Sequence, residues 1–260
     1  QEELYRSGVL NDQETYWLKE FRGEIPVLEL PCDFPRPPVQ DFAGDALFFT
    51  LDSRLSGGLK KLAVERDVTL FMLLLALYTI LLSKYSDRED IIVGSVAAGR
   101  PHADMENIIG MFVDTRVMRN FPARGKNFLE FLAEVKERTL QAFANQDYQF
   151  EELVEKLEIR RDVSRSPLFD TMLVLQNVEP AEIKTGKLRF KPFEYENKTA
   201  KFDLIITAAE SGEEIAFSLR YRTALFKRGT IERMAGHFEN IAGQVTEPVE
   251  RRLEDIDIIS

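Results

Sequence analysis

The chain has 260 residues, 44% of them apolar, and its 34 Lys and Arg against 44 Asp and Glu give a net charge of −10. This composition is typical of a folded globular protein and excludes intrinsic disorder, and the acidic balance provides no general attraction for nucleic acid. The single cysteine, Cys32, excludes an internal disulfide framework and a thiolate zinc site, and with only two separate histidines we expect no bound metal.

The N-terminal part predicts a helix and then an extended connector. Apolar residues on one side of 13–22 indicate the helix. Five prolines between Pro26 and Pro38 remove amide donors and fix φ, so 25–45 is expected to cross a surface without forming a helix or an inner strand. A strand over 47–51 and a helix over 56–66 are expected next.

The most apolar segment, 70–82, is shorter than the roughly 20 residues that a bilayer span needs. Thr69 is typical of an N-cap, so we predict a buried helix over 69–85 in a cytoplasmic protein that makes no membrane contact. The chain begins at Gln1 without an initiator methionine or a signal peptide, and we interpret it as a piece of a longer or processed protein.

The remaining elements mix strands and helices without a regular βαβ repeat. Strands are expected over 90–97, 112–118, 173–175, 202–208 and 215–221, and helices over 127–144, 150–157 and 230–245. The last two strands form a predicted hairpin across Ser211-Gly212, and a ribbon is expected near 188–195. The fold class is therefore α/β, a mixed sheet backed by helices.

Isolated chemical motifs are weak in this sequence. Gly94 and Gly99 have the glycine spacing of a phosphate-binding loop, but Arg100-Pro101 follow where lysine and a hydroxyl residue are needed, so we interpret the glycines as marking a strand end. His102 is interpreted as a solvated loop histidine and His237 as a surface or packing residue of the last helix.

Three polar segments, 108–119, 145–151 and 161–169, contain residues that can fix a turn or a loop. A glycine enters a strand in the first, a tyrosine seats a turn in the second, and an ion pair followed by proline holds a loop in the third. The residues to which we assign this structural role are Gly110, Asp114, Asp147, Tyr148, Arg161, Asp162, Arg165 and Pro167.

As an ordered set, IGMFVDT (109–115), QDYQFE (146–151) and RDVSRSPLF (161–169) resemble the last three core motifs of nonribosomal peptide synthetase condensation domains. The segment 16–38 resembles the stretch after the fourth motif, so the resemblance covers essentially the whole chain. The sequence departs from the family pattern at Asn145, where the family usually has histidine, at Gln149, where it has proline, and at Asp114, where asparagine is common.

The resemblance implies a fold like that of chloramphenicol acetyltransferase, with two α/β lobes around a tunnel. Catalysis in the family centres on an HHxxxDG motif of the N-terminal half, which this chain lacks. We therefore expect no catalytic residue in this chain, a C-terminal lobe over 46–260, and a helix and connector over 1–45 that follow the N-terminal lobe. The expected partners are that lobe and peptidyl or aminoacyl carrier proteins, whose phosphopantetheine arms are substrates and not bound cofactors.

Two side-chain amides, Gln176 and Asn177, follow the apolar MLVL and are the candidates for lining the tunnel. A contact with a loop is the simpler alternative, since a buried amide needs a partner. The loop near 94–107 resembles the family's floor loop, and 178–201 resembles the latch that reaches the other lobe.

The function that we expect is amide formation between two carrier-bound thioesters, with this fragment inactive alone. Two alternatives stay open at this point, a non-catalytic lobe that docks carrier proteins and a relative of the epimerization domains. A lobe separated from its partner would expose apolar surface, so self-association is also expected.

Overall fold

A computed structural model describes residues 8–98, 108–110, 112–159, 162–176, 183–185, 188–190, 198–246 and 250–258. The main strands are β1 (Gly44–Leu51), β2 (Ile91–Ala98), β3 (Val113–Asn120), β4 (Thr171–Gln176), β7 (Leu204–Ser211) and β8 (Glu214–Arg222). A separate ribbon consists of β5 (Ile183–Thr185) and β6 (Leu188–Phe190). The helices are α2 (Val9–Glu20), α3 (Ser53–Glu65), α4 (Leu70–Ser86), α5 (Phe128–Ala144), α6 (Phe150–Lys156) and α7 (Arg228–Thr246).

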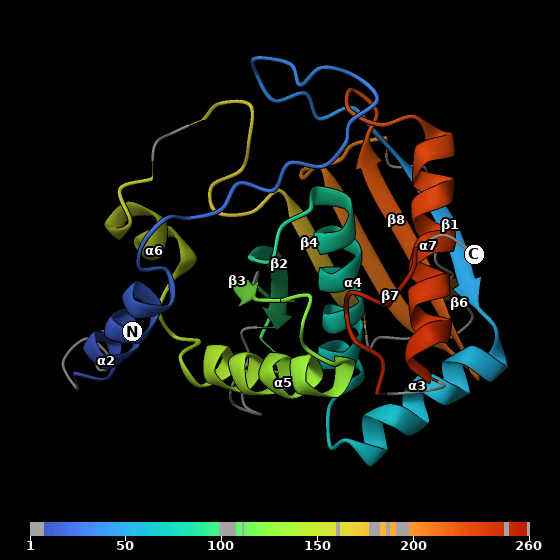
Figure 1. Ribbon diagram of the computed structural model, residues 1–260. Coiled ribbons are helices and arrows are strands. Elements are labelled where there is room, and N and C mark those ends of the chain that lie inside the picture. Colours follow the sequence, from blue (N-terminus) through green and yellow to red (C-terminus); the bar gives the residue numbers. More distant parts are fainter. Residues whose placement is uncertain are drawn as a thin grey trace.

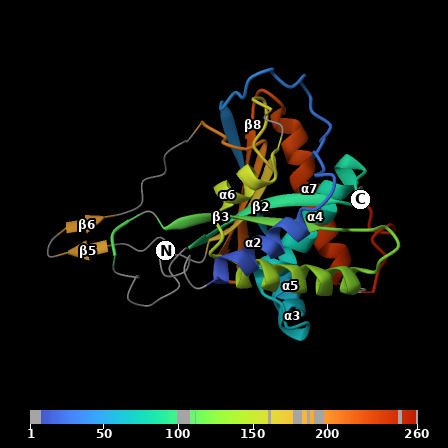
Figure 2. The ribbon, with the colours of Figure 1, turned by 90° about the vertical axis from the view of Figure 1, so that its left-hand side faces the viewer.

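The main strands form one mixed sheet in the order β1-β8-β7-β4-β2-β3. The β7-β4 and β4-β2 pairs are parallel and the other pairs are antiparallel. Helices α4 and α7 lie across one face, with α3 and α5 beside them (Figure 1). The β5–β6 ribbon projects from the opposite side (Figure 2). The expected fold class, a mixed sheet backed by helices, is confirmed.

Helix α4 lies at the centre of the core. Residues 72–82 are all buried, as predicted, and Thr69 Oγ1 accepts a hydrogen bond from Met72 N at 3.2 Å as the N-cap. Within the described residues no single helix is both long and apolar enough to cross a bilayer. Helices α3 and α4 together reach that length and apolarity, but the pair is bent by 112° at its junction.

The start of α5 shows how local sequence fixes a boundary. Asn127 Oδ1 accepts from Glu130 N at 2.9 Å, and Glu130 Oε2 accepts from Asn127 N at 2.9 Å. This reciprocal capping box satisfies two backbone amides that a helix start leaves without partners. Phe128, Phe131 and Val135 then bury one face of the helix, as their spacing predicts.

The connector after α2 contains no helix or regular strand over 22–42, as the prolines predict. It is held to the edge of the sheet by Arg119 of β3. The Arg119 guanidinium donates to the backbone oxygens of Glu20 and Glu24, both at 3.0 Å, and to the carboxylate of Asp90 at 2.7 and 3.0 Å. One side chain thus fixes the end of α2 and the first residues of the connector against the sheet.

The predicted hairpin is confirmed as β7 and β8, although β7 begins at Leu204 and not at Phe202. The strand starts later because the backbone and side chain of Asp203 have other partners. Asp203 N donates to Asp170 O at 2.9 Å, and the Asp203 carboxylate forms ion pairs. The predicted ribbon lies earlier than expected, with Ile183–Thr185 paired antiparallel to Leu188–Phe190. Residues 191–195 of that prediction lie outside the described residues.

Candidate functional site

The candidate site is the face of the sheet opposite α4 and α7. On β8, Ile215, Phe217 and Leu219 are buried toward the helices, so the alternate residues point to the other face. Strand register aligns these alternate residues across β1, β8, β7 and β4. The first row is Thr50, Ala216, Ala209 and Gln176, the second is Phe48, Ser218, Thr207 and Val174, and the third is Ala46, Arg220, Ile205 and Met172.

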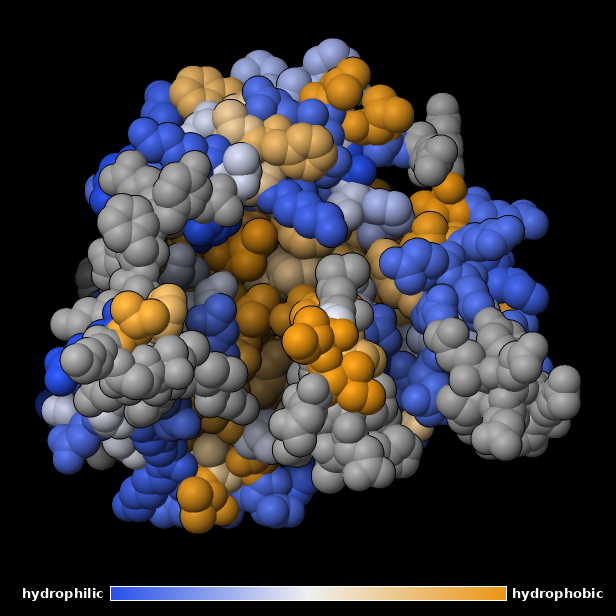
Figure 3. Space-filling model, turned by 180° about the vertical axis from the view of Figure 1, so that it is seen from behind, coloured by the Kyte–Doolittle hydropathy of each residue, from blue (hydrophilic) through white to orange (hydrophobic). Residues whose placement is uncertain are grey.

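We call the surface formed by these three rows the uncovered face. Phe48 is 75% exposed, an unusual exposure for a phenylalanine in a sheet. The three rows contain no carboxylate, and Arg220 is their single ionic residue, although the chain has a net charge of −10. Seen from behind, the molecule is hollowed at its centre, and the bottom of the hollow is apolar to neutral (Figure 3). The uncovered face therefore lacks the carboxylates that predominate in the rest of the chain.

Gln176 ends β4 on the uncovered face, where it pairs with Ala209 of β7. Its side chain is exposed and makes no hydrogen bond within the described part of the chain, so the loop contact that was the simpler expectation is not found there. Asn177, the other candidate for lining a tunnel, lies outside the described residues. The structure therefore places one free amide beside the small residues of the first row.

Residues of the 108–119 segment lie apart from the uncovered face. Asp114 pairs in register with Ala97, and its carboxylate accepts from Arg116 Nη1 at 2.6 Å. Asp114 and Arg116 occupy alternate positions of β3, and strand register aligns Arg116 with Leu173 and Leu219, so the pair lies on the helix side of the sheet. A Cβ on Gly110 would lie 2.9 Å from the ring of Phe112. Both contacts support the structural interpretation of this segment.

Turn residues of the 145–151 segment are joined to α2 by a residue that the sequence did not single out. Gln13 Oε1 accepts from the backbone amides of Asp147 and Tyr148, both at 2.9 Å, and Gln13 Nε2 donates to Asp147 Oδ2 at 3.1 Å. The Tyr148 ring is buried, and its hydroxyl donates to Glu14 at 3.1 Å. These contacts hold the turn in place and leave the Asp147 carboxylate engaged.

The loop that contains the 161–169 motif is held by short-range contacts. Asp162 Oδ1 accepts from Ser164 N at 2.8 Å and Ser164 Oγ at 2.7 Å, and these bonds lower the pKa of the Asp162 carboxyl. Arg165 donates to Leu28 O at 3.1 Å and pairs with Asp170. Pro167 lies four residues before β4, and Arg161 lies outside the described residues. The loop therefore binds the connector to the start of β4.

A buried charge cluster joins the connector to the sheet, and sequence reasoning missed it. Asp203, 2% exposed, pairs with Arg36 of the connector and with Arg222 of β8 at 3.2 Å. Asp170 lies beside this cluster, and its pKa is raised by burial and then by the charge of Asp203. Buried ions persist only when paired, so the cluster fixes where the connector crosses the strand ends.

Gly94 and His237 both have structural roles in the described part of the chain. Gly94 lies inside β2 and not at its end, and a Cβ there would lie 2.2 Å from the Phe169 ring. The glycine thus makes room for the phenylalanine of the 161–169 motif. His237 Nδ1 lies 2.8 Å from the hydroxyl of Tyr85, and His102 lies outside the described residues. No cluster of metal-ligating side chains occurs among the residues that the structure describes.

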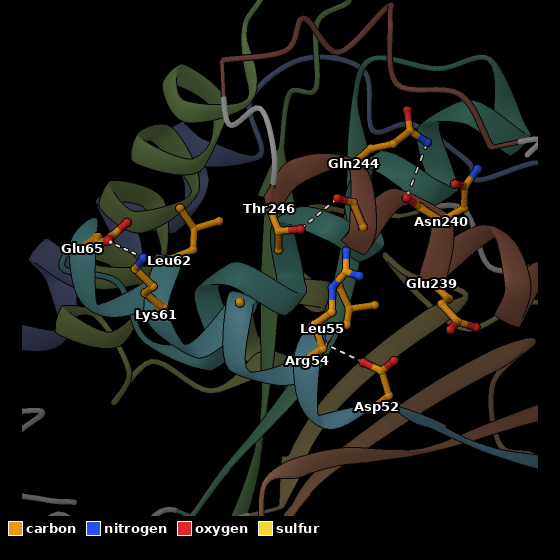
Figure 4. A pocket seen from close by; sticks show the side chains of 12 residues that line it. Asp52, Arg54, Leu55, Lys61, Leu62, Glu65, Glu239, Asn240, Gln244 and Thr246 are labelled. Carbon is orange, nitrogen blue, oxygen red and sulfur yellow. Dashed lines mark hydrogen bonds and ion pairs between the residues drawn. The ribbon is translucent and has the colours of Figure 1, made fainter.

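The cavities between the described residues include two that lie away from the uncovered face. One, of about 550 Å³, lies between α3 and α7, where Lys61 pairs with Glu65 and Asp52 caps α3 (Figure 4). Of its other polar groups, Asn240 and Gln244 donate to the backbone oxygen of Asp257 in the C-terminal segment. The second, of about 1150 Å³, lies between the connector, α6 and the 162–170 loop, and several carboxylates line it. Neither cavity contains a nucleophile paired with a base.

Comparison with known proteins gives one consistent result. The family model for the condensation domain matches residues 1–260. Tyrocidine synthase 3 of Brevibacillus parabrevis is 51% identical over 260 residues, which is 100% of this chain but 4% of that protein's length. A four-domain nonribosomal peptide synthetase, solved with AMP and glycine, matches 95% of this chain and 20% of its own with a TM-score of 0.89 and 25% identity. The first condensation domain of the CDA synthetase shares the fold, with a TM-score of 0.75 and 15% identity over 100% of this chain and 55% of its own.

Proposed function

The chain belongs to the condensation domain family, and from this premise we propose that it is one lobe of a domain that joins two carrier-bound thioesters through an amide bond. The observation that carries the proposal is the uncovered face, because a sheet face that has no carboxylate and exposes Phe48 is typical of an interaction surface. The match to 55% of a single condensation domain supports a second lobe as that cover. The tyrocidine relative, a synthase, supports the peptide-forming reaction.

In this proposal residues 1–45 lead from an N-terminal lobe that carries HHxxxDG, and residues 46–260 form the C-terminal lobe. The uncovered face then forms one wall of the tunnel between the lobes. The β5–β6 ribbon supports this orientation, since it projects from the same side of the sheet as the uncovered face (Figure 2). Two carrier proteins enter from opposite ends, and their phosphopantetheine arms present the thioesters as substrates.

The reaction requires little of this lobe beyond positioning. The acceptor amine attacks the donor thioester carbonyl, a C–N bond forms, the C–S bond breaks, and the thiol leaves with the proton that the amine gives up. Holding the two groups in line lowers the entropic barrier, and a covered tunnel keeps water from hydrolysing the thioester. The Gln176 amide, which has no partner among the described residues, is suited to hydrogen-bond the amides of a pantetheine arm or an acceptor.

The test is an amide-formation assay with loaded donor and acceptor carriers, this chain, and a separately produced N-terminal lobe. We expect product when both lobes are present and none from this chain alone. Gln176→Ala is expected to slow condensation by about tenfold, the effect of one lost hydrogen bond. Gln141→Ala on the exposed side of α5 is the matched control and should leave the rate unchanged. Turnover by this chain alone would overturn the proposal, and an unchanged rate in Gln176→Ala would remove the role of that amide.

A further inference from the structure

β1 leaves one edge of the main sheet open. It is the last strand of the sheet next to β8, so its outer edge pairs with no strand among the described residues (Figure 1). Its sequence, GDALFFTL, contains no proline, lysine or arginine, which are the residues that commonly protect an edge strand from pairing with another chain. A long apolar edge of this kind is a template for an added strand.

Hydrogen bonds at the start of β1 show which backbone groups lie on the outer edge. Ala43 O accepts from Thr223 N at 3.1 Å, which is on the β8 side. Gly44 N donates to Lys198 O at 2.9 Å and so points to the other side. Because the backbone groups of successive strand residues point to alternate sides, those of the even-numbered residues of β1 point away from β8.

The middle of the outer edge has free backbone groups. Lys198 and the Asp45 carboxylate take up the amides at the start of the edge, the latter by accepting from Ala46 N at 2.8 Å. The N–H and C=O groups of Phe48 and Thr50 follow on the same edge, and none of them has a partner among the described residues. Both residues are exposed, and Phe48 is 75% exposed. The edge is therefore open to another strand at these two residues.

A second copy of β1 offers the same free groups at the same spacing. With a two-fold axis at Phe49, Phe48 of each copy lies opposite Thr50 of the other. In an antiparallel ladder such opposite residues exchange both of their backbone hydrogen bonds. The two symmetry-related pairs then satisfy every free N–H and C=O of Phe48 and Thr50, and a two-fold arrangement is the commonest form of a protein dimer.

Side chains and charges fit this register. Phe49 of one copy lies directly opposite Phe49 of the other, at a position where Cα atoms are about 4.5 Å apart. Phe49 already stacks on Phe217 with 4.9 Å between ring centroids, so pairing would continue a row of aromatic rings from one sheet into the next. Asp45 comes next to Arg54 of the second copy, and Arg54 makes no ion pair within the described part of the chain. Opposite charges therefore meet at both ends of the paired strands.

We propose that two copies of this chain pair antiparallel along the outer edge of β1 and join their sheets into one. The inference goes beyond the proposed function, because it uses backbone groups at the edge of the sheet and leaves the uncovered face available to a second lobe. A dimer formed through the uncovered face would instead leave the edge unpaired, so variants at the edge distinguish the two arrangements.

Sedimentation equilibrium of this chain between about 1 μM and about 1 mM measures the pairing. We expect a reversible equilibrium between monomer and dimer. Thr50→Pro removes an N–H that points away from β8, where an edge strand tolerates proline, and it should weaken the dimer about tenfold by the loss of two symmetry-related hydrogen bonds. Thr50→Val keeps the N–H and is the matched control. A chain that stays monomeric over the whole range, or equal dissociation constants for the two variants, would overturn the inference.

Disulfide cross-linking tests the register without a proline. In a Cys32→Ser background, chains with Phe48→Cys are mixed with chains with Thr50→Cys and oxidised. We expect a disulfide between positions 48 and 50, because the Cα atoms of such a pair lie about 5.5 Å apart, within the range that a disulfide spans. Val64→Cys on α3, where the native side chain is 81% exposed, is the control and should cross-link much less with either chain. A dimer in which positions 48 and 50 cross-link no more than this control would contradict the pairing.

Discussion

Gly94→Ala should destabilise the protein although it adds one methyl group to a strand. The new Cβ would lie 2.2, 2.5 and 2.6 Å from three ring carbons of Phe169, where ordinary carbon contacts are about 3.5–4.0 Å. The ring would have to move by more than about 1 Å, but it is 4% exposed and packs against Phe150 and Phe202 at centroid distances of 5.6 and 5.0 Å. Overpacking of this kind costs about 1–3 kcal/mol.

The assay is urea denaturation of Gly94→Ala beside Gly57→Ala. Gly57 lies on the exposed side of α3 with open space where its Cβ would be, so the same substitution there should stabilise by about 0.8–1.0 kcal/mol through helix propensity. In a Phe169→Ala background the clash disappears, so a double-mutant cycle should show a coupling of at least about 0.5 kcal/mol. Equal effects at the two glycines, or additive effects of Gly94→Ala and Phe169→Ala, would refute the reasoning.

Three further changes are expected to act in defined directions. Asn127→Ala removes the side-chain oxygen that accepts from Glu130 N at the start of α5 and should cost about 1 kcal/mol in a thermal melt, and no shift would argue against the cap. Asp203→Ala leaves Arg36 and Arg222 without their buried partner and should cost about 3–5 kcal/mol in urea, whereas a cost below about 1 kcal/mol would contradict the cluster. Burial and the charge of Arg233 lower the pKa of His237 in the folded state. Unfolding therefore takes up a proton, and stability should fall as the pH drops through about 6.5. His237→Gln should flatten that slope, and an unchanged pH profile would contradict the assignment.

Much of the fold follows from signals that are local in the sequence. The boundaries of α4 and α5 depend on Thr69 and Asn127, which cap the first turn of their own helices. The predicted hairpin formed because β7 and β8 alternate large apolar residues with small or polar ones and are joined by a short turn. The same alternation determines which residues form the uncovered face, since Thr207 and Ala209 lie on the side of β7 opposite the buried residues.

Contacts between distant segments were not predictable. Gln13 meets the turn at Asp147 and Tyr148 across more than 130 residues, and nothing near Gln13 marks it as a partner. Likewise the fit of Phe169 onto Gly94 joins two segments that sequence reasoning treated separately, a glycine motif and a loop motif. The approach of Phe169 to Gly94 depends on the register of the parallel strands β2 and β4, in which Gly94 pairs with Met172, and a pattern of residue types does not specify that register.

Thiol accessibility of the uncovered face tests the central claim most directly, because the account requires that face to line a covered tunnel. In a Cys32→Ser background, Thr207→Cys places a thiol on the uncovered face, and Val64→Cys places one on α3, where the native side chain is 81% exposed. The account predicts that the thiol at position 207 reacts much more slowly with a bulky maleimide in the complete domain than in this chain alone, while the thiol at position 64 reacts equally in both. Equal rates at position 207 in the two proteins would contradict it.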